Sequence, residues 1–203
     1  MKAIQVANDQ SLTWTDFKKP IPDDYELLIK VAATAINRAD LMQRSGRYPP
    51  PPGVSPIMGL ECAGEVVAIG ASCSRYKEGD TVCALLPGGG YAEYAVADEN
   101  SVLPVPDGLT LTHAAGLPEV FATAWLNLFM EGGVQPGEKV VLHAGASGVG
   151  TAAIQICRTN AVETFVTVGS DRKLSACIQL GASGGVNRKK KPILDAVLDF
   201  WSD

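Results

Sequence analysis

A glycine-rich segment in the second half of the chain has the spacing of a phosphate-binding turn. Residues 148–153 read Gly-Val-Gly-Thr-Ala-Ala, a G-x-G-x-x-A pattern, between the apolar runs 139–142 and 154–157. We therefore expect a strand that turns through glycines into a helix. In such a turn Gly148 permits the tight bend, Gly150 lets the backbone approach a pyrophosphate, and Ala153 lets the helix pack on the strand. The free N–H groups and the dipole of the helix start favour an anion there.

The glycine spacing alone is a weak signal, because any glycine-rich turn from strand to helix can produce it. A second apolar run, residues 164–168, follows at the distance that a β-α-β unit requires. The spacing and the unit together predict that this segment binds a dinucleotide.

The residues after the second apolar run bear on which dinucleotide is bound. A carboxylate at this position holds the ribose hydroxyls of NAD, whereas hydroxyls and cations accommodate the phosphate of NADP. Here Ser170 is followed by Asp171, Arg172 and Lys173, which favours NADPH. Asp171 has two possible roles: it could serve as the NAD-type acid, or it could cap a helix over residues 172–180.

The composition is that of a globular protein. The chain has 203 residues, of which 46% are hydrophobic, and a net charge of −5. This is enough apolar material for a core, and the mild acidity argues against nucleic acid or an anionic membrane as a partner. We find neither a leader segment nor an apolar run long enough to cross a membrane, so we expect a cytoplasmic protein.

The cysteines predict neither disulfides nor a metal site. Their number is odd, and no two of them form a C-x-x-C pair. The chain has only two histidines, and His143 falls next to the glycine turn. We therefore expect reduced thiols and no bound metal. The cysteines are Cys62, Cys73, Cys83, Cys157 and Cys177.

The first half of the chain reads as a β-rich, barrel-like domain. One helix is expected at residues 38–44, with Asn37 at its capping position. Residues 110–131 are expected to be helical with a break near Pro118, and we place the domain boundary there, between residues 118 and 119. The expected strands are residues 2–7, 11–17, 26–35, 62–69, 81–86, 91–97 and 101–105.

An ordered set of motifs before the glycine turn resembles one known family. The motifs are Asn-Arg-Ala-Asp-Leu-Met-Gln-Arg at 37–44, Tyr48 with its prolines, Gly-Leu-Glu at 59–61, Gly-Asp at 79–80 and Leu-Pro-Gly-Gly-Gly at 86–90. The chain resembles the medium-chain dehydrogenase/reductase family, in its quinone oxidoreductase branch. The resemblance implies an α/β protein: a chaperonin-10-like (GroES-like) catalytic domain over 1–118 and the first half of a Rossmann domain over 119–203, with NADPH in the cleft between them.

The resemblance also implies the chemistry. Zinc-dependent relatives carry a cysteine where this chain has Asn37 and a histidine where it has Leu60, so the implied activity is zinc-independent. Hydride would pass from NADPH to a quinone or conjugated carbonyl, with Asn37 and Tyr48 lining the substrate cleft and donating to the oxygen that gains charge. Read without the family, Asn37 is a helix cap and Tyr48 packs in its loop against prolines.

Further residues are implied as cofactor contacts. Thr123 would face the nicotinamide, although it could equally be an ordinary helix residue. Ser170 and Lys173 would contact the phosphate of the adenosine. Arg188 stands where relatives usually carry an aromatic residue near the adenine, and it could stack there or reach the phosphate. The segment around the pyrophosphate would be 145–150, with contacts from Gly145, Ser147, Gly148, Val149 and Gly150.

The family sequence continues well beyond the last residues of this chain. Relatives complete the Rossmann sheet, return to the catalytic domain and pair as homodimers through segments that follow Phe200. We therefore expect an exposed sheet edge. A second interpretation is a truncated isoform with little or no turnover, which retains nucleotide binding or binds a partner.

Residues 192–201 have apolar side chains at helical spacing. They could form the crossover helix that packs on the sheet, or a tail whose apolar face is exposed or binds a partner. The lysines at 189–191 suit a solvated loop rather than a helix start. The apolar positions are Ile193, Leu194, Val197, Leu198 and Trp201.

Overall fold

The computed structural model describes residues 1–202. The chain divides into two compact units, Met1–Glu119 and Val120–Asp203. The division falls one residue after the domain boundary expected from the sequence.

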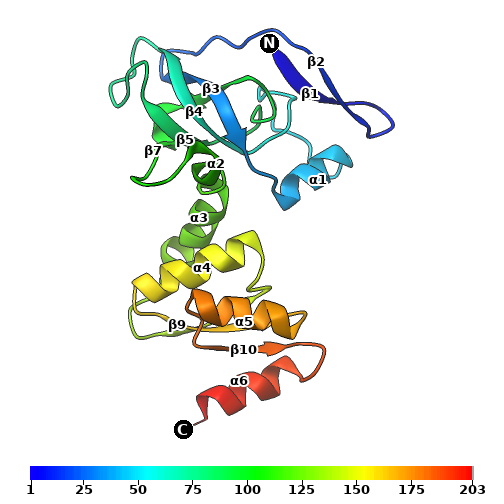
Figure 1. The fold of residues 1–203 in the computed structure, drawn as a ribbon, viewed down its shortest axis with the longest axis vertical. Helices are drawn as coiled ribbons and strands as arrows, with labels where there is room; N and C mark the ends of the chain where they lie inside the picture. Colours follow the sequence, from blue (N-terminus) through cyan, green and yellow to red (C-terminus); the bar gives the residue numbers. More distant parts are fainter. Residues whose placement is uncertain (203) are drawn as a thin grey trace. The chain divides into compact units, whose positions relative to one another are not determined.

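Unit 1 is built from antiparallel strands (Figure 1). Strands β1 (Lys2–Val6) and β2 (Leu12–Asp16) form a separate two-stranded sheet. The larger sheet has the order β6-β3-β4-β5-β7, and every pair in it is antiparallel. This confirms the expected β-rich architecture. The strands of the larger sheet are β3 (Glu26–Thr34), β4 (Glu61–Ile69), β5 (Thr81–Leu85), β6 (Tyr94–Asp98) and β7 (Val102–Pro104).

Irregularities in β3 help to curl this sheet. The register between β3 and β4 shifts at Leu28/Ile29 and again at Val31/Ala33, and such shifts bend a strand and increase its twist. The curled sheet encloses a core of aliphatic side chains. Its fully buried members include Leu27, Ile29, Val66, Val82 and Val102.

One expected strand begins later than the sequence suggested. Alternation predicted a strand from residue 91, but β6 begins at Tyr94. The backbone before it is used elsewhere: the N–H of Tyr91 donates to the carbonyl of Met58, and Ala92 forms an isolated bridge with Ala3. The physical reason is that two other segments compete for the same backbone groups.

The helices of the first 131 residues follow the sequence prediction. Helix α1 spans Arg38–Arg44, α2 spans Leu111–Ala114, and α3 begins at Pro118 and ends at Trp125. A π-helical turn, Leu126–Glu131, continues α3, and a short 3₁₀ turn, Glu99–Ser101, precedes β7. In the described part of the chain, no helix is both long and apolar enough to span a membrane.

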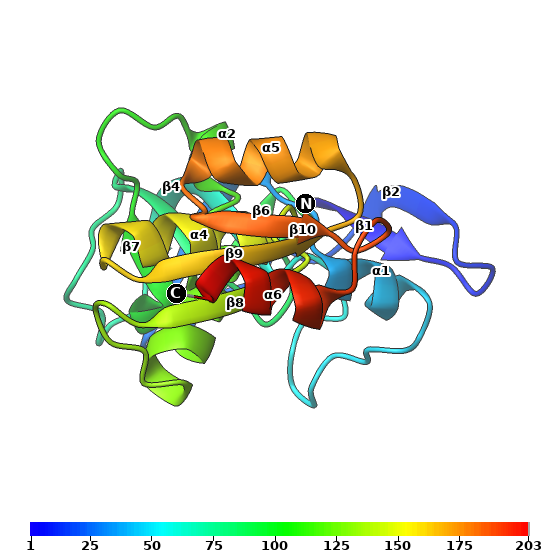
Figure 2. The ribbon, with the colours of Figure 1, turned by 90° about the horizontal axis from the view of Figure 1, so that it is seen from below.

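Unit 2 is a three-stranded parallel sheet with helices on both faces (Figure 2). The strands have the order β10-β9-β8 and alternate with helices along the chain, which is the β-α-β arrangement predicted from the glycine turn. The elements are β8 (Lys139–His143), α4 (Gly148–Thr159), β9 (Glu163–Val168), α5 (Asp171–Leu180), β10 (Gly184–Asn187) and α6 (Ile193–Trp201).

Alternation along β9 assigns the helices to the two faces. Val166 and Val168 pack in a cluster with residues of α4 and α5. Phe165, on the opposite face, packs with Ala196 of α6, and its ring centroid lies 5.1 Å from that of Phe200 and 5.8 Å from that of Trp201. Helix α6 therefore covers the sheet, as the crossover interpretation predicted.

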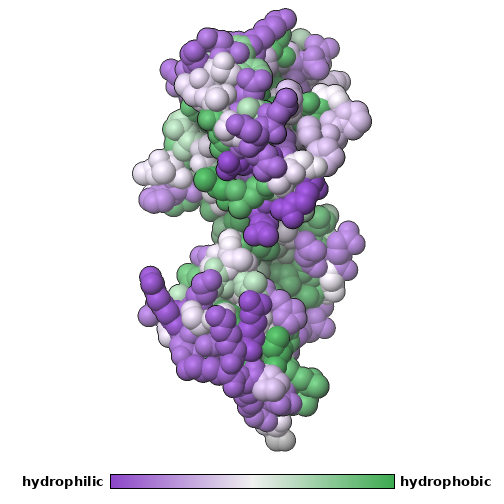
Figure 3. Space-filling view, turned by 90° about the vertical axis from the view of Figure 1, so that its right-hand side faces the viewer, coloured by the Kyte–Doolittle hydropathy of each residue, from purple (hydrophilic) through white to green (hydrophobic). Residues whose placement is uncertain are grey.

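The apolar positions of α6 do not all face the sheet. Ile193, Val197 and Trp201 pack on it, whereas Leu194 and Leu198 are 67% and 58% exposed. Ala196, rather than Leu194 or Leu198, packs against the sheet. The face of a helix that meets a flat sheet is narrower than the whole apolar stripe of α6. Figure 3 shows hydrophobic patches that interrupt the hydrophilic surface near the α6 end of the molecule.

Phe165→Ala should lower the free energy of unfolding of unit 2 by about 3–5 kcal/mol, because it removes a buried ring that α6 covers. Denaturation in urea, followed by tryptophan fluorescence, would measure the loss. Leu198→Ala is the control on the exposed side of α6, and we expect it to change stability by about 0.5 kcal/mol or less. Equal losses for the two variants would contradict the observed docking of α6.

Candidate functional site

The turn between β8 and α4 is held by its own backbone. Ala144 has a left-handed conformation, with φ of 54°, and its carbonyl accepts from the N–H of Ser147 at 2.8 Å. Ser147 is the N-cap of α4, and its hydroxyl accepts from the N–H of Gly150 at 3.1 Å. By helix geometry the N–H groups of Gly148 and Val149 have no partner inside α4. They are the donors that an anion would use.

Two glycines of this turn are required by close packing, Gly150 against backbone and Gly145 against the side chain of Val166. A Cβ on Gly150 would lie 2.6 Å from the carbonyl oxygen of Ala144, and a Cβ on Gly145 would lie 2.7 Å from the Cβ of Val166. Gly148 does not make the tight bend that the motif assigned to it. It is already the first residue of α4, and the left-handed residue of the turn is Ala144.

A cavity of about 170 Å³ lies at the carboxyl ends of β8 and β9. It includes three of the predicted cofactor residues: Ser147, Lys173 and Arg188. Whole-ligand pockets are usually about 300–1,000 Å³, so this cavity suits one phosphate-bearing portion of a dinucleotide. Its lining residues are Ala144, Ala146, Ser147, Thr167, Val168, Gly169, Lys173 and Arg188.

The start of α5 differs from the sequence prediction. Ser170, not Asp171, is the N-cap, and its hydroxyl accepts from the N–H of Lys173 at 3.4 Å. Asp171 is the first helical residue, so the prediction that it caps the helix is wrong. Its carboxylate accepts from Asn187 at 2.9 Å and from Lys190 at 2.5 Å. The hydrogen bond from Lys190 holds the pKa of Asp171 below its usual value.

Two further residues bear on the nucleotide side. Thr167 was missed by the sequence analysis although it lines the cavity; its hydroxyl lies 3.1 Å from Nδ1 of His143. A polar residue at the carboxyl end of a buried strand was the available signal. Thr123 lies in α3, where its carbonyl accepts from Asn127 at 2.8 Å. Its contact with a nicotinamide stays a prediction.

In unit 1, Asn37 is the N-cap of α1, as expected, and forms a capping box with Asp40, and its side chain also reaches Glu61. Its backbone N–H donates to the carboxylate of Asp40 at 2.7 Å, and its side-chain Nδ2 donates to Oε1 of Glu61, also at 2.7 Å. An amide nitrogen carries two N–H donors. One of them is held by Glu61.

Two buried carboxylates hold Asn37 from two directions. Glu61 also accepts from the backbone N–H of Glu119 at 2.9 Å, and Asp40 accepts from the hydroxyl of Tyr91 at 2.8 Å. Burial is the main cause that raises the pKa of Glu61 and that of Tyr91. No role for these acids was predicted from the sequence. The signals were a carboxylate three residues after Asn37, as in a capping box, and a charge at the start of an apolar strand.

Tyr48 lies in the segment after α1 and is 46% exposed. It is therefore accessible, but its contact with a substrate stays a prediction. A separate apolar hollow of about 600 Å³ lies along β2 and β3, and Tyr91 belongs to its wall. Neither Asn37 nor Tyr48 lines this hollow. The structure thus brings Asn37 together with the buried acids and does not place Tyr48 with them.

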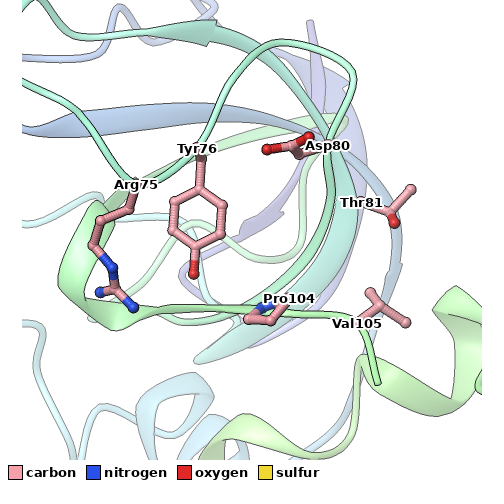
Figure 4. Close-up of a pocket in the computed structure, with 6 residues that line it drawn as sticks. All are labelled: Arg75, Tyr76, Asp80, Thr81, Pro104 and Val105. Carbon is pink, nitrogen blue, oxygen red and sulfur yellow. The ribbon is translucent and has the colours of Figure 1, made fainter. Parts of the chain in front are cut away.

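A polar hollow of about 490 Å³ also lies in unit 1, near β5 and β7 (Figure 4). Its hydrogen-bonding groups serve the fold: the hydroxyl of Tyr76 donates to the carbonyl of Val102 at 2.6 Å, and Arg75 donates to the carbonyl of Glu99 at 3.0 Å. None of the predicted site residues lines it. The lining residues are Arg75, Tyr76, Asp80, Thr81, Pro104 and Val105.

The raised pKa of Glu61 makes stability depend on pH. Its contribution is fully present below its unfolded-state pKa, for which the usual glutamate value is 4.5, and it is lost as the pH rises through the higher folded-state pKa. Gln cannot ionise. We therefore expect the unfolding free energy of Glu61→Gln, relative to wild type, to improve as the pH rises from about 4 to about 8, measured by urea denaturation at each pH.

The replacement also turns one acceptor oxygen into a donor, which adds a cost that does not vary with pH. The pH-dependent part of the difference is therefore the test. Glu65→Gln, at an exposed position of the same strand, is the control. Parallel pH curves for the two variants would contradict the assignment.

Comparisons with known proteins agree with this architecture. Residues 23–107 match the alcohol dehydrogenase GroES-like domain. The chain is 33% identical over 184 residues to a quinone oxidoreductase of Mus musculus, covering 90% of this chain and 56% of that protein. The chain therefore spans a little over half the length of this relative.

Solved structures give the same result. A quinone oxidoreductase of Pseudomonas syringae superposes with a TM-score of 0.86 at 30% identity, covering 98% of this chain and 62% of the other. The Escherichia coli quinone oxidoreductase, solved in complex with NADPH, superposes with a TM-score of 0.83 at 25% identity, covering 98% and 61%. The chain belongs to the medium-chain dehydrogenase/reductase family, in its quinone oxidoreductase branch.

Proposed function

We propose that this protein is an NADPH-dependent reductase that transfers hydride to quinones or conjugated carbonyls, without zinc. The observation that carries the proposal is the cavity beside the turn between β8 and α4, which has two cationic side chains, Lys173 and Arg188, in its wall. Cations at this end of the sheet suit the additional phosphate that distinguishes NADPH from NADH. The NADPH complex of the Escherichia coli relative supports this choice of cofactor.

The residues of unit 2 fit the two charged parts of the cofactor. The pyrophosphate would bind at the start of α4, where Gly148 and Val149 present N–H groups and Ser147 fixes the turn. Lys173 and Arg188 would bind the adenosine phosphate, with the hydroxyl of Ser170 beside them. Thr123 would contact the nicotinamide. When bound, NADPH supplies the hydride.

The substrate oxygen would be bound by donors from unit 1. An oxygen that gains charge during hydride transfer is stabilised by preorganised hydrogen bonds, and Glu61 holds the Asn37 amide in one orientation at 2.7 Å. Tyr48 supplies a second, exposed hydroxyl. The aliphatic side chain of Leu60 and the amide of Asn37 stand where zinc-dependent relatives have metal ligands, which supports hydrogen bonding in place of a Lewis acid. The reduced product would take its protons from water.

The remaining assignments follow the family. We propose small quinones or enones as substrates and pairing of two copies as a homodimer. The five cysteines are free thiols, which favours a reducing compartment such as the cytoplasm.

Lys173→Ala should weaken NADPH binding by about 1.5–3 kcal/mol, the range for a hydrogen bond to a charged group. NADH lacks the phosphate, so its affinity should change little. Titration of the nicotinamide fluorescence with each cofactor measures both affinities on the same variant. Equal losses for NADPH and NADH would show that Lys173 does not contact the phosphate.

Loss of nicotinamide absorbance, with NADPH and a simple ortho-quinone as substrates, tests the activity. Turnover supports the reductase. Binding of NADPH without turnover supports a second candidate, a nucleotide-binding protein with little or no catalysis. A folded chain that binds neither NADPH nor NADH would contradict both candidates.

A further inference from the structure

Asp171 is an unexpected residue at a site that we assign to NADPH. It lies three residues after the end of β9 and begins α5, two residues before the cavity-lining Lys173. A carboxylate in this region of the fold suits the ribose hydroxyls of NADH and repels a phosphate. Its hydrogen bond from Lys190 lowers its pKa, so the group is ionised at neutral pH. A negative charge therefore lies close to the proposed phosphate site, and phosphate binding requires that this charge be balanced.

Both oxygens of the Asp171 carboxylate accept hydrogen bonds from side chains at the end of β10 and in the turn that follows it. Oδ1 accepts from Nδ2 of Asn187 at 2.9 Å, and Oδ2 accepts from Nζ of Lys190 at 2.5 Å. Asp171 is not among the residues that line the cavity. Its charge is balanced by Lys190 and directed toward that turn.

Asn187 is itself fixed in place. It is buried, with 8% of its surface exposed. Its side-chain oxygen accepts from the N–H of Lys189 at 3.2 Å, and its carbonyl accepts from the N–H of Lys190 at 2.9 Å. The amide nitrogen is therefore presented to Asp171 by a closed turn rather than by a free side chain.

The same turn places a cation in the cavity wall. The N–H of Arg188 donates to the carbonyl of Val168 at 3.0 Å, which continues the hydrogen bonding of β10 to β9. The side chain of Arg188 lines the cavity. One short segment thus contributes a cation to the site and binds the nearest carboxylate.

We propose that Asn187 and Lys190 make Asp171 compatible with NADPH, and that Lys190 is a specificity residue that acts through Asp171. The inference rests on the proposed function. With Lys190 in place, Lys173 and Arg188 are free to bind a phosphate. Without it, the carboxylate is free to repel the phosphate, to pair with Lys173 or to bind ribose hydroxyls. Each of these changes favours NADH over NADPH.

The ion pair itself adds little to folding. The side chains of Lys190 and Asp171 are 68% and 59% exposed, and exposed pairs contribute little to stability. Lys190→Ala should therefore fold normally. A change in cofactor preference can then be separated from a change in stability.

The experiment compares the affinities of the complete chain for NADPH and NADH in low salt, where electrostatic effects are largest. We expect Lys190→Ala to lower the preference for NADPH by about three- to tenfold. Lys191→Ala is the matched control, because it removes the same charge from the next residue, whose ammonium pairs with Asp199 of α6. It should leave the preference unchanged.

A second variant separates action through Asp171 from direct contact of Lys190 with the phosphate. Adding Asp171→Asn to Lys190→Ala removes the carboxylate and should restore the preference. A preference unchanged in Lys190→Ala, or one that Asp171→Asn does not restore, would overturn the inference alone. Equal affinities of the wild-type chain for NADPH and NADH would overturn it as well, because no preference would exist. Binding of neither cofactor would overturn the proposed function with it.

Discussion

The close approach of Gly150 to the carbonyl of Ala144 is the constraint on which the turn between β8 and α4 in unit 2 depends. A Cβ on Gly150 would lie 2.6 Å from that oxygen. Only glycine therefore lets the chain pass from β8 through residues 144–147 into α4 in this geometry. This turn places the first N–H groups of α4 at the carboxyl edge of the sheet. The last two residues of β9, Thr167 and Val168, lie at the same edge and line the cavity. A helix start and two strand ends converge there, which explains why the cavity forms at this edge.

Unit 1 positions its candidate site residue with buried carboxylates, whereas the turn before α4 in unit 2 is positioned by backbone contacts. Asp40 and Glu61 lie in the interior of unit 1, and each accepts from Asn37 and from one other donor, the hydroxyl of Tyr91 or the N–H of Glu119. A buried carboxylate is costly unless its oxygens are hydrogen-bonded. Both oxygens of Glu61 have such partners, whereas Oδ1 of Asp40 is buried without one among the described residues. The hydrogen bonds that stabilise Glu61 also fix the orientation of the Asn37 amide.

Local patterns predicted the elements of this chain well. Alternation, helical spacing and turn residues located the strands of unit 1, β8 and β9 of unit 2, and the helices, because each depends on neighbours in sequence. Where such patterns gave a wrong prediction, the residues form hydrogen bonds with a segment that is distant in the sequence. The backbone before β6 pairs with Met58 and Ala3 instead of extending the strand. Asp171 has the character of a helix cap, yet its carboxylate meets Lys190, nineteen residues away.

The sequence by itself determined the family, the β-α-β unit and the residue types that suit NADPH, since spacing and composition carry that information. Only the tertiary structure decided how those residues are used. It assigned the cap of α5 to Ser170, joined Asn37 to Glu61 across 24 residues, and turned the carboxylate of Asp171 toward the turn after β10. The physical reason is that charge and hydrogen-bond partners are set by distance in space, and folding brings together groups that no local pattern relates.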